Sequence, residues 1–230
     1  SDVNREVNKL TGLELAEIKR IFREGLCQIV ARESDGQTEV LDLLNFGDRG
    51  SQEDVSYILH SVGYNFEEVK PLPVDVVEKT KTGKIIESIT TKEEAEQQGR
   101  GAYTEEGEIK SWYDKKERFM NVQVYNDELI PFLVEKYECD YILFINQLDI
   151  KVMRDVNRDN GQTWARRIMI HFSLLDGEGK EVFSSAVYGH YGGDEKDIYQ
   201  IIGKNFARPA QRLLSVIPSS SEESSLAAYI

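Results

Sequence analysis

The sequence predicts an α+β or α/β fold, with an antiparallel or mixed sheet of four to six strands and amphipathic helices packed on it. Apolar residues recur at helical spacing between Leu15 and Ile29, an apolar run at 141–145 has the length of a buried strand, and residues 164–174 alternate as a strand does. A chain of 230 residues with 40% hydrophobic and 30% charged residues has a globular composition and can bury a sizeable core. We therefore expect one α/β domain over residues 1–217, with a polar insertion at about 78–118 and a Ser-rich, disordered tail at 218–230.

The amino-terminal part contains one clear helix. Residues 11–14 (Thr-Gly-Leu-Glu) fit a capping box, in which Thr and Glu side chains bond the first free amides of a helix. The amphipathic pattern behind it ends near the Ser-Asp-Gly turn at 34–36. A strand at 39–44 and a short helix at 51–59 are expected to follow.

The middle of the chain is polar. Two β-rich runs within 74–89 flank Lys81-Thr82-Gly83, which predicts a hairpin. The stretch 91–100 has a second capping box but only Ala95 as an apolar residue, so a helix there would have nothing to bury. The glycine and charge content of 99–116 predicts a long loop.

The carboxyl-terminal part predicts a helix, a three-stranded meander and a last helix. Asn126 is expected to cap a helix whose first turn holds Asp127 and Glu128. The apolar run at 141–145 predicts a central strand covered on both faces, which continues to residue 152 and pairs with strands at 164–174 and 182–188. A final helix should start near Asp194 and break at Pro209.

Charge and cysteine content exclude several classes. The formal net charge of −13, without any Lys/Arg cluster, disfavours nucleic acid as a partner. No apolar run approaches the roughly 20 residues of a transmembrane helix. Cys27 and Cys139 are too few for a zinc site and have the pattern of two buried thiols. A single disulfide between them is the alternative in an oxidising compartment.

Residues 125–217 resemble a known family. The run from Leu133 through Asp140 to Leu143, followed by Asp176-Gly177-Glu178-Gly179 and Val182, is similar to the α/β domain of bacterial envelope lipoproteins of the curli-secretion type and of the TolB amino-terminal type. In those domains a helix ends in a K-x-x-A-D-Y element before a central strand and a D-x-x-G-x-x-V hairpin. The resemblance implies an envelope location and a binding or assembly role without catalysis. Such domains usually open with an apolar strand, and none precedes Thr11 here.

Two loops are candidate binding sites. Residues 155–161 place oxygen ligands as a calcium loop does, but the glycine falls one place late and Arg166 stands where a bidentate Glu is needed, so the Asn-Gly pair predicts a hairpin turn instead. The glycine-rich run 189–193 lacks dinucleotide-binding spacing. Three residues at this strand end, Tyr188, His190 and Tyr191, are the predicted binding residues.

No residue is predicted to be catalytic, and no cofactor or metal is expected. The predicted function is a non-enzymatic binding or assembly module of the bacterial cell envelope, a lipoprotein or periplasmic protein whose partners are other envelope proteins. The chain holds no transmembrane segment, and a lipid anchor would lie outside it. The alternative is a small-ligand-binding protein, or a hydrolase with an unrecognised carboxylate site.

Overall fold

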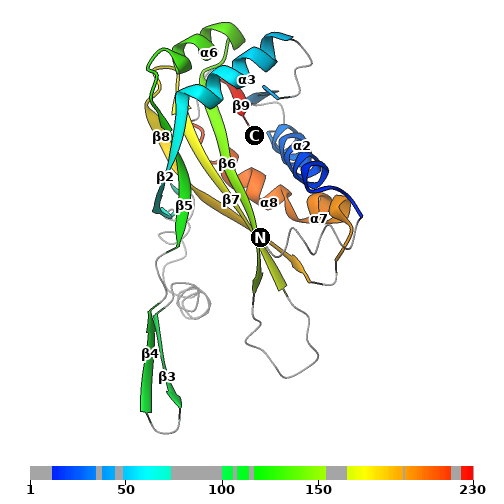
Figure 1. The fold of residues 1–230 in the computed structure, drawn as a ribbon, viewed down its shortest axis with the longest axis vertical. Coiled ribbons are helices and arrows are strands. Elements are labelled where there is room, and N and C mark those ends of the chain that lie inside the picture. Colours follow the sequence, from blue (N-terminus) through cyan, green and yellow to red (C-terminus); the bar gives the residue numbers. More distant parts are fainter. Residues whose placement is uncertain are drawn as a thin grey trace.

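The computed structural model describes residues 12–34, 38–44, 49–73, 100–105, 108–113, 117–153, 165–193, 195–218 and 224–229. The helices of this part of the chain are α2 (Leu15–Glu33), α3 (Arg49–Ser61), α6 (Leu129–Tyr137), α7 (Ile198–Asn205) and α8 (Ala207–Leu214) (Figure 1). The strands are β1 (Thr38–Asp42), β2 (Val62–Glu68), β3 (Arg100–Glu105), β4 (Glu108–Tyr113), β5 (Arg118–Val124), β6 (Tyr141–Met153), β7 (Ala165–Asp176), β8 (Glu181–Gly192) and β9 (Ser224–Tyr229).

A five-stranded mixed sheet forms the centre, in the order β1-β9-β6-β7-β8. The strands β6, β7 and β8 make the expected antiparallel meander, and β9 lies parallel to both β1 and β6. Ile142, Leu143 and Phe144 of β6 are all buried, which confirms a central strand covered on both faces. The α+β fold and the strand number predicted from the sequence are thus confirmed.

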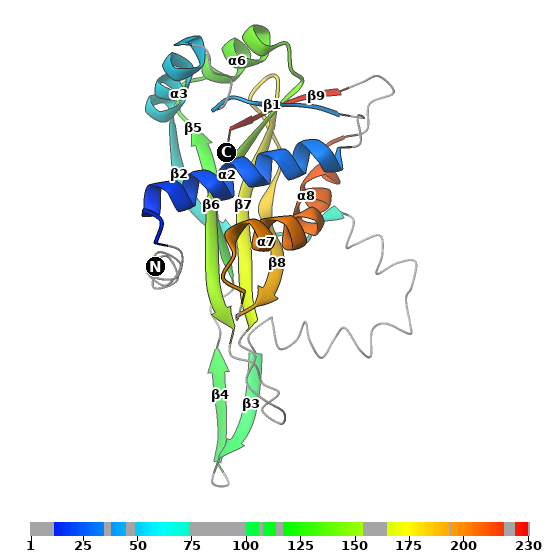
Figure 2. The ribbon, with the colours of Figure 1, turned by 90° about the vertical axis from the view of Figure 1, so that its right-hand side faces the viewer.

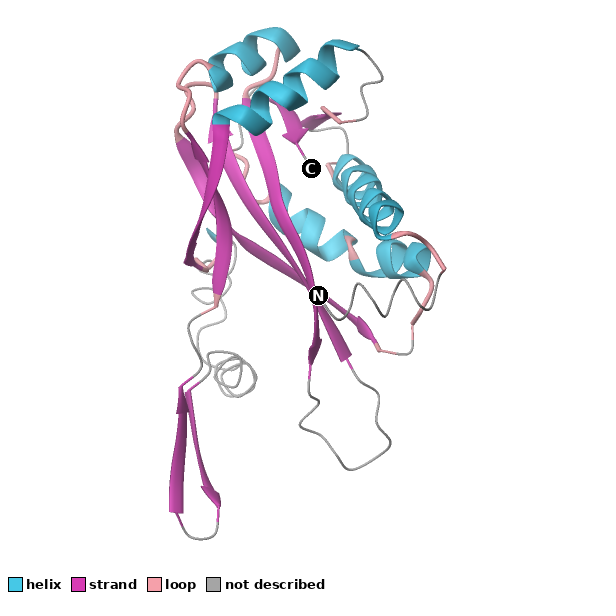
Figure 3. Cartoon of the chain, in the orientation of Figure 1, coloured by secondary structure: helices cyan, strands magenta, loops and turns pink. Residues whose placement is uncertain are grey.

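The helices α2, α7 and α8 cover one face of the sheet (Figure 3). Alternate residues of β7, including Ile168, Ile170 and Phe172, are fully buried against this layer. The last helix begins at Ile198, with Asp197 accepting two backbone N–H bonds as its cap, rather than near Asp194. The break was expected at Pro209 but falls at Phe206, because a proline in the first turn of α8 occupies a position where no backbone N–H is needed.

The strands β2 and β5, which the sequence did not predict, form an antiparallel ribbon on the opposite face of the sheet. The helices α3 and α6 lie together at one end of the sheet, joined by a Lys136 Nζ–Asp54 Oδ2 ion pair of 2.7 Å (Figure 1). Asn126 is not the cap of α6. Its Oδ1 accepts the Glu128 N–H in the preceding turn, and Glu128 is the first flanking residue of the helix.

The strands β3 and β4 form a two-stranded hairpin, which we call the arm, where the sequence predicted a long loop. Its register pairs Arg100 with Tyr113 and Glu105 with Glu108. The arm extends away from the sheet and the helices (Figure 2). Composition alone was misleading here because glycine and charge are compatible with an exposed hairpin as well as with a loop.

The expected disordered tail is corrected at 224–229, which form β9 inside the central sheet. Its Ser and Ala residues carry no period that distinguishes a strand, and its pairing is entirely with distant segments. The predictions for 74–99, for the 155–161 loop and for 219–223 lie outside the described residues. Cys27 and Cys139 are buried thiols that are not joined in a disulfide, in agreement with the predicted pair of buried thiols. No helix in the described ranges is long and apolar enough to span a membrane.

Candidate functional site

The face of the sheet beneath the β2–β5 ribbon carries a set of hydrogen-bonded polar side chains, which we call the polar layer. It comprises Glu67, Lys70, Asn121, Asn146, Asp149, His171, Ser173 and Glu181. Alternation along β7 creates it, because residues 169, 171 and 173 face the ribbon while 168, 170 and 172 face the helices.

His171 is buried, with both ring nitrogens directed at the protein. Its Nδ1 accepts the backbone N–H of Met120 at 2.8 Å, which places the proton of the neutral ring on Nε2. Nε2 lies 3.6 Å from Asp149 Oδ2. The interaction with His171, together with a hydrogen bond from Gln147 Nε2, lowers the pKa of Asp149 against the opposing effect of burial. The ring thus holds β5 in place through the Met120 N–H. Because that bond occupies the lone pair of Nδ1, this nitrogen is not available as a catalytic base.

Ser173 is the second anchor of β5. Its Oγ accepts the Val122 N–H at 3.1 Å and donates to Asn121 Oδ1 at 2.6 Å. Asn146 Nδ2 donates to the same Oγ at 2.7 Å. His171 and Ser173, two residues apart on β7, therefore receive the amides of Met120 and Val122, two residues apart on β5, so the ribbon docks in one register.

A charged group closes the layer at its edge. Asn121 Nδ2 donates to Glu67 Oε1 and Glu181 Oε2, at 2.8 and 2.9 Å. Lys70 Nζ donates to Glu181 Oε1 at 3.0 Å. Burial raises the pKa of Glu181, but the bonds from Asn121 and Lys70 outweigh it, and the net shift is downward. Burial lowers the pKa of Lys70, and Glu181 and Glu67 reverse this to a net rise.

The three predicted binding residues do not form one site. Tyr188 faces the ribbon and donates its hydroxyl to Glu117 Oε2 at 3.0 Å, with the Arg167 guanidinium 5.1 Å from its ring centre. Burial, followed by the charge of Glu117, raises the pKa of Tyr188 far above its usual range. His190 is the cross-strand partner of Arg167. Partial burial and then the Arg167 charge lower the pKa of His190.

Tyr191 belongs to the other face of the same strand. It is buried among the core residues under α2, α7 and α8, because neighbouring residues of a strand point to opposite faces. The sequence placed it with Tyr188 because both are aromatic, and strand alternation could have separated them.

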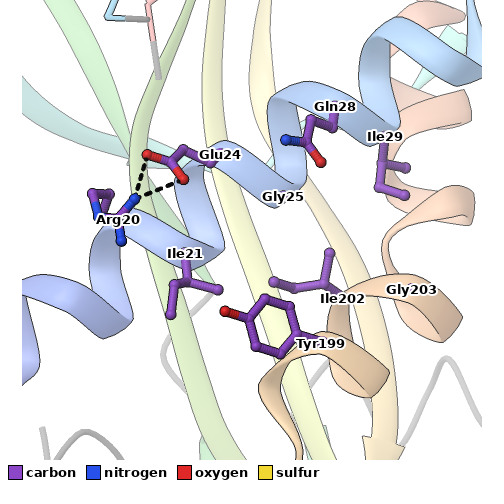
Figure 4. A pocket seen from close by; sticks show the side chains of 9 residues that line it. All are labelled: Arg20, Ile21, Glu24, Gly25, Gln28, Ile29, Tyr199, Ile202 and Gly203. Atoms are coloured by element: carbon purple, nitrogen blue, oxygen red, sulfur yellow. Dashed lines mark hydrogen bonds and ion pairs between the residues drawn. The ribbon is translucent and has the colours of Figure 1, made fainter. Parts of the chain in front are cut away.

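A second candidate is a pocket of about 300 Å³ between α2 and α7 (Figure 4). Ile21, Ile29 and Ile202 supply its apolar wall. Glu24 at the rim accepts two bonds from Arg20 Nη1, at 3.0 and 3.1 Å. Tyr199 reaches over the same pocket from α7. No sequence pattern predicts this pocket, since its two groups of lining residues lie some 180 positions apart along the chain.

The polar layer attaches the β2–β5 ribbon to the central sheet. Its hydroxyls, amides and carboxylates bond one another across β2, β5, β6, β7 and β8, so the layer fixes the ribbon on the sheet. Among the residues that the structure describes, no three His, Cys, Asp or Glu side chains are grouped as a metal site.

A comparison of the chain with family models, with curated proteins and with solved structures finds no match in any of the three.

Proposed function

We propose that this chain is a non-enzymatic binding or assembly module of the bacterial cell envelope, which docks on another protein through the arm. The observation that carries the docking element is the isolation of β3–β4. A two-stranded hairpin is at best marginally stable in water, and β3 and β4 make their main contacts only with each other among the described elements. A partner surface would supply the missing packing.

The polar layer supports the same proposal by fixing the base of the arm. The strand β5 begins at Arg118, so only four residues separate it from the end of β4 at Tyr113. The backbone of β5 is bonded to His171 and Ser173 of the sheet. An arm that leaves a ribbon held in one register is presented to a partner in a defined direction, which lowers the entropy cost of binding.

The proposed envelope location rests on the resemblance of residues 125–217 to envelope lipoprotein domains. The acidic net charge of −13 agrees with protein partners rather than nucleic acid or an anionic lipid surface. The resemblance supports the proposed location, and the charge supports protein partners. Cell fractionation tests the location.

The experiment compares the full chain with a variant whose residues 101–112 are replaced by a Gly-Ser linker. Both are cross-linked in cells and purified from separated envelope and cytosolic fractions. The matched control is Leu59→Ala, an exposed change on α3, outside the arm and outside the pocket between α2 and α7. We expect one stoichiometric envelope protein with the wild type and the control, and its loss from the linker variant while the melting temperature stays unchanged.

Two results would overturn the proposal. Recovery of the same partner by the linker variant would remove the arm as the docking element. A protein found entirely in the cytosolic fraction would remove the envelope role.

The pocket between α2 and α7 favours a second candidate, a small-ligand-binding function. Its volume of about 300 Å³ lies at the lower end of the range of ligand pockets. A thermal-shift screen of small polar-aromatic compounds tests it. A hit whose shift disappears in Tyr199→Ala supports this candidate, and the absence of any such hit removes it.

A further inference from the structure

We propose that the slot between β1 and β6 is a strand-exchange site, in which β9 of a second copy of this chain takes the place of the chain's own β9. The occupant is a segment of identical sequence, so the proposal concerns self-association and does not depend on the arm or its partner.

The first support is the position of β9. It lies between β1 and β6 and joins them, since the sheet order is β1-β9-β6 (Figure 2). Its register pairs Thr38–Asp42 with Ser224–Ala228 on one side and Tyr141–Phe144 with Leu226–Tyr229 on the other. Without β9, two parallel edges would face each other with their backbone N–H and C=O groups unpaired. The slot therefore needs a strand.

The second support is the way in which β9 is held. The backbone of Ser224–Tyr229 pairs with β1 on one side and with β6 on the other. Its main contacts among the described elements are the ladders with β1 and β6. Backbone ladders recognise an extended segment whichever chain supplies it. The same segment from a second copy reproduces every pairing of the first.

The third support is the connection. The helix α8 packs on α2 and β8, so it belongs to the body of the chain. The chain reaches β9 from α8 through Pro218 and the residues up to 223. An element that is tied to its body by one short connection can be exchanged between copies while both bodies keep their cores, which is the usual route to a swapped dimer.

The test uses two single-cysteine additions to the full chain, Thr38→Cys and Ser224→Cys. These positions are Cα partners in the β1–β9 ladder, and neighbouring strands are at a spacing that a disulfide can bridge. The two variants are mixed, incubated just below the unfolding temperature and oxidised. Mass spectrometry then quantifies the peptide pair joined through positions 38 and 224. In this mixture that pair can join only two different copies, and a yield above random collision shows that β9 of one copy lies beside β1 of another.

We expect the 38–224 pair in the mixture, with a dimer-to-monomer ratio that rises in proportion to protein concentration. The control mixture combines Ser224→Cys with Lys204→Cys on α7 and reports random collision. The double variant Thr38→Cys/Ser224→Cys should form the same bond within one chain at low concentration.

The proposal is overturned if the double variant forms its internal bond while the mixture gives no more 38–224 pair than the control at any concentration. It is equally overturned if the double variant forms no 38–224 bond at all, because β9 would then not lie beside β1.

Discussion

The backbone N–H of Met120 donates a hydrogen bond of 2.8 Å to Nδ1 of His171, and this bond joins the β2–β5 ribbon to the central sheet. The two residues lie 51 positions apart in the chain, on β5 and β7. A histidine that accepts a backbone amide and turns Nε2 toward Asp149 is a structural residue, and its removal should be measured as a loss of stability.

His171→Phe should lower the free energy of unfolding by about 1–3 kcal/mol, because the Met120 N–H would lose its acceptor. His171→Asn keeps an acceptor oxygen near the position of Nδ1 and should lose less. Urea unfolding at neutral pH measures both. Equal stability of the Phe variant and the wild type would show that the amide finds another partner and that the ring does not anchor β5.

The packing of α2 on α7 makes opposite predictions for two glycines. A Cβ at Gly25 would lie 2.8 Å from Cδ1 and Cγ2 of Ile202, so Gly25→Ala should overpack the helix contact. We expect a net loss of about 1 kcal/mol, after the gain in helix propensity is offset by the clash. A Cβ at Gly203 meets nothing within 4 Å, so Gly203→Ala should be stabilising by up to about 1 kcal/mol.

Thermal unfolding of the two alanine variants measures this difference. Each change adds one methyl group to a helix interior, and so each is the control of the other. Shifts of the same sign in both variants would contradict the close approach of the two helices at Gly25.

Glu181 should contribute to acid denaturation. Its pKa lies below the ordinary value of 4.5, through Asn121 and Lys70, so the ionised group stabilises the folded chain above that pH. The contribution is lost as the pH falls through the lowered pKa. Glu181→Gln should therefore be less stable than the wild type at pH 7, and the difference should shrink between about pH 5 and pH 3.

Urea midpoints across that pH range measure the effect. Glu178→Gln is the matched control. Glu178 lies exposed in the β7–β8 turn, and its substitution removes the same charge. A Glu181→Gln difference that stays constant with pH would show that the carboxylate is not stabilised by its neighbours.

The native thiols should be inert. Burial, followed by the nearby Asp42 carboxylate, raises the pKa of Cys27 to about 12, which leaves on the order of one thiolate in ten thousand at pH 8. Cys139 is 3% exposed. Titration with an aromatic disulfide reagent at pH 8 should find no thiol in the native protein within minutes and two in denaturant. Rapid reaction of one thiol before unfolding would contradict the buried position of that residue.

The sequence by itself determined the elements with a strong local period. The stripe from Ile18 to Ile29 predicted α2, and the run 141–145 predicted the buried strand β6, because a helix and a doubly covered strand each leave a pattern within a few turns or residues of the chain. The meander β6–β7–β8 followed from alternation and a short turn between the last two strands.

Only the tertiary structure decided which segments pair across long distances. The strand β9 has no local pattern of its own, and its place beside β1 and β6 comes from backbone bonds to residues more than 80 positions away. The polar layer could not be predicted for the same reason, since the hydrogen bond between Met120 and His171 exists only when β5 crosses β7. Local periodicity records which face of an element is buried, whereas the partner on that face is set by hydrogen bonds that form after the chain has folded back on itself.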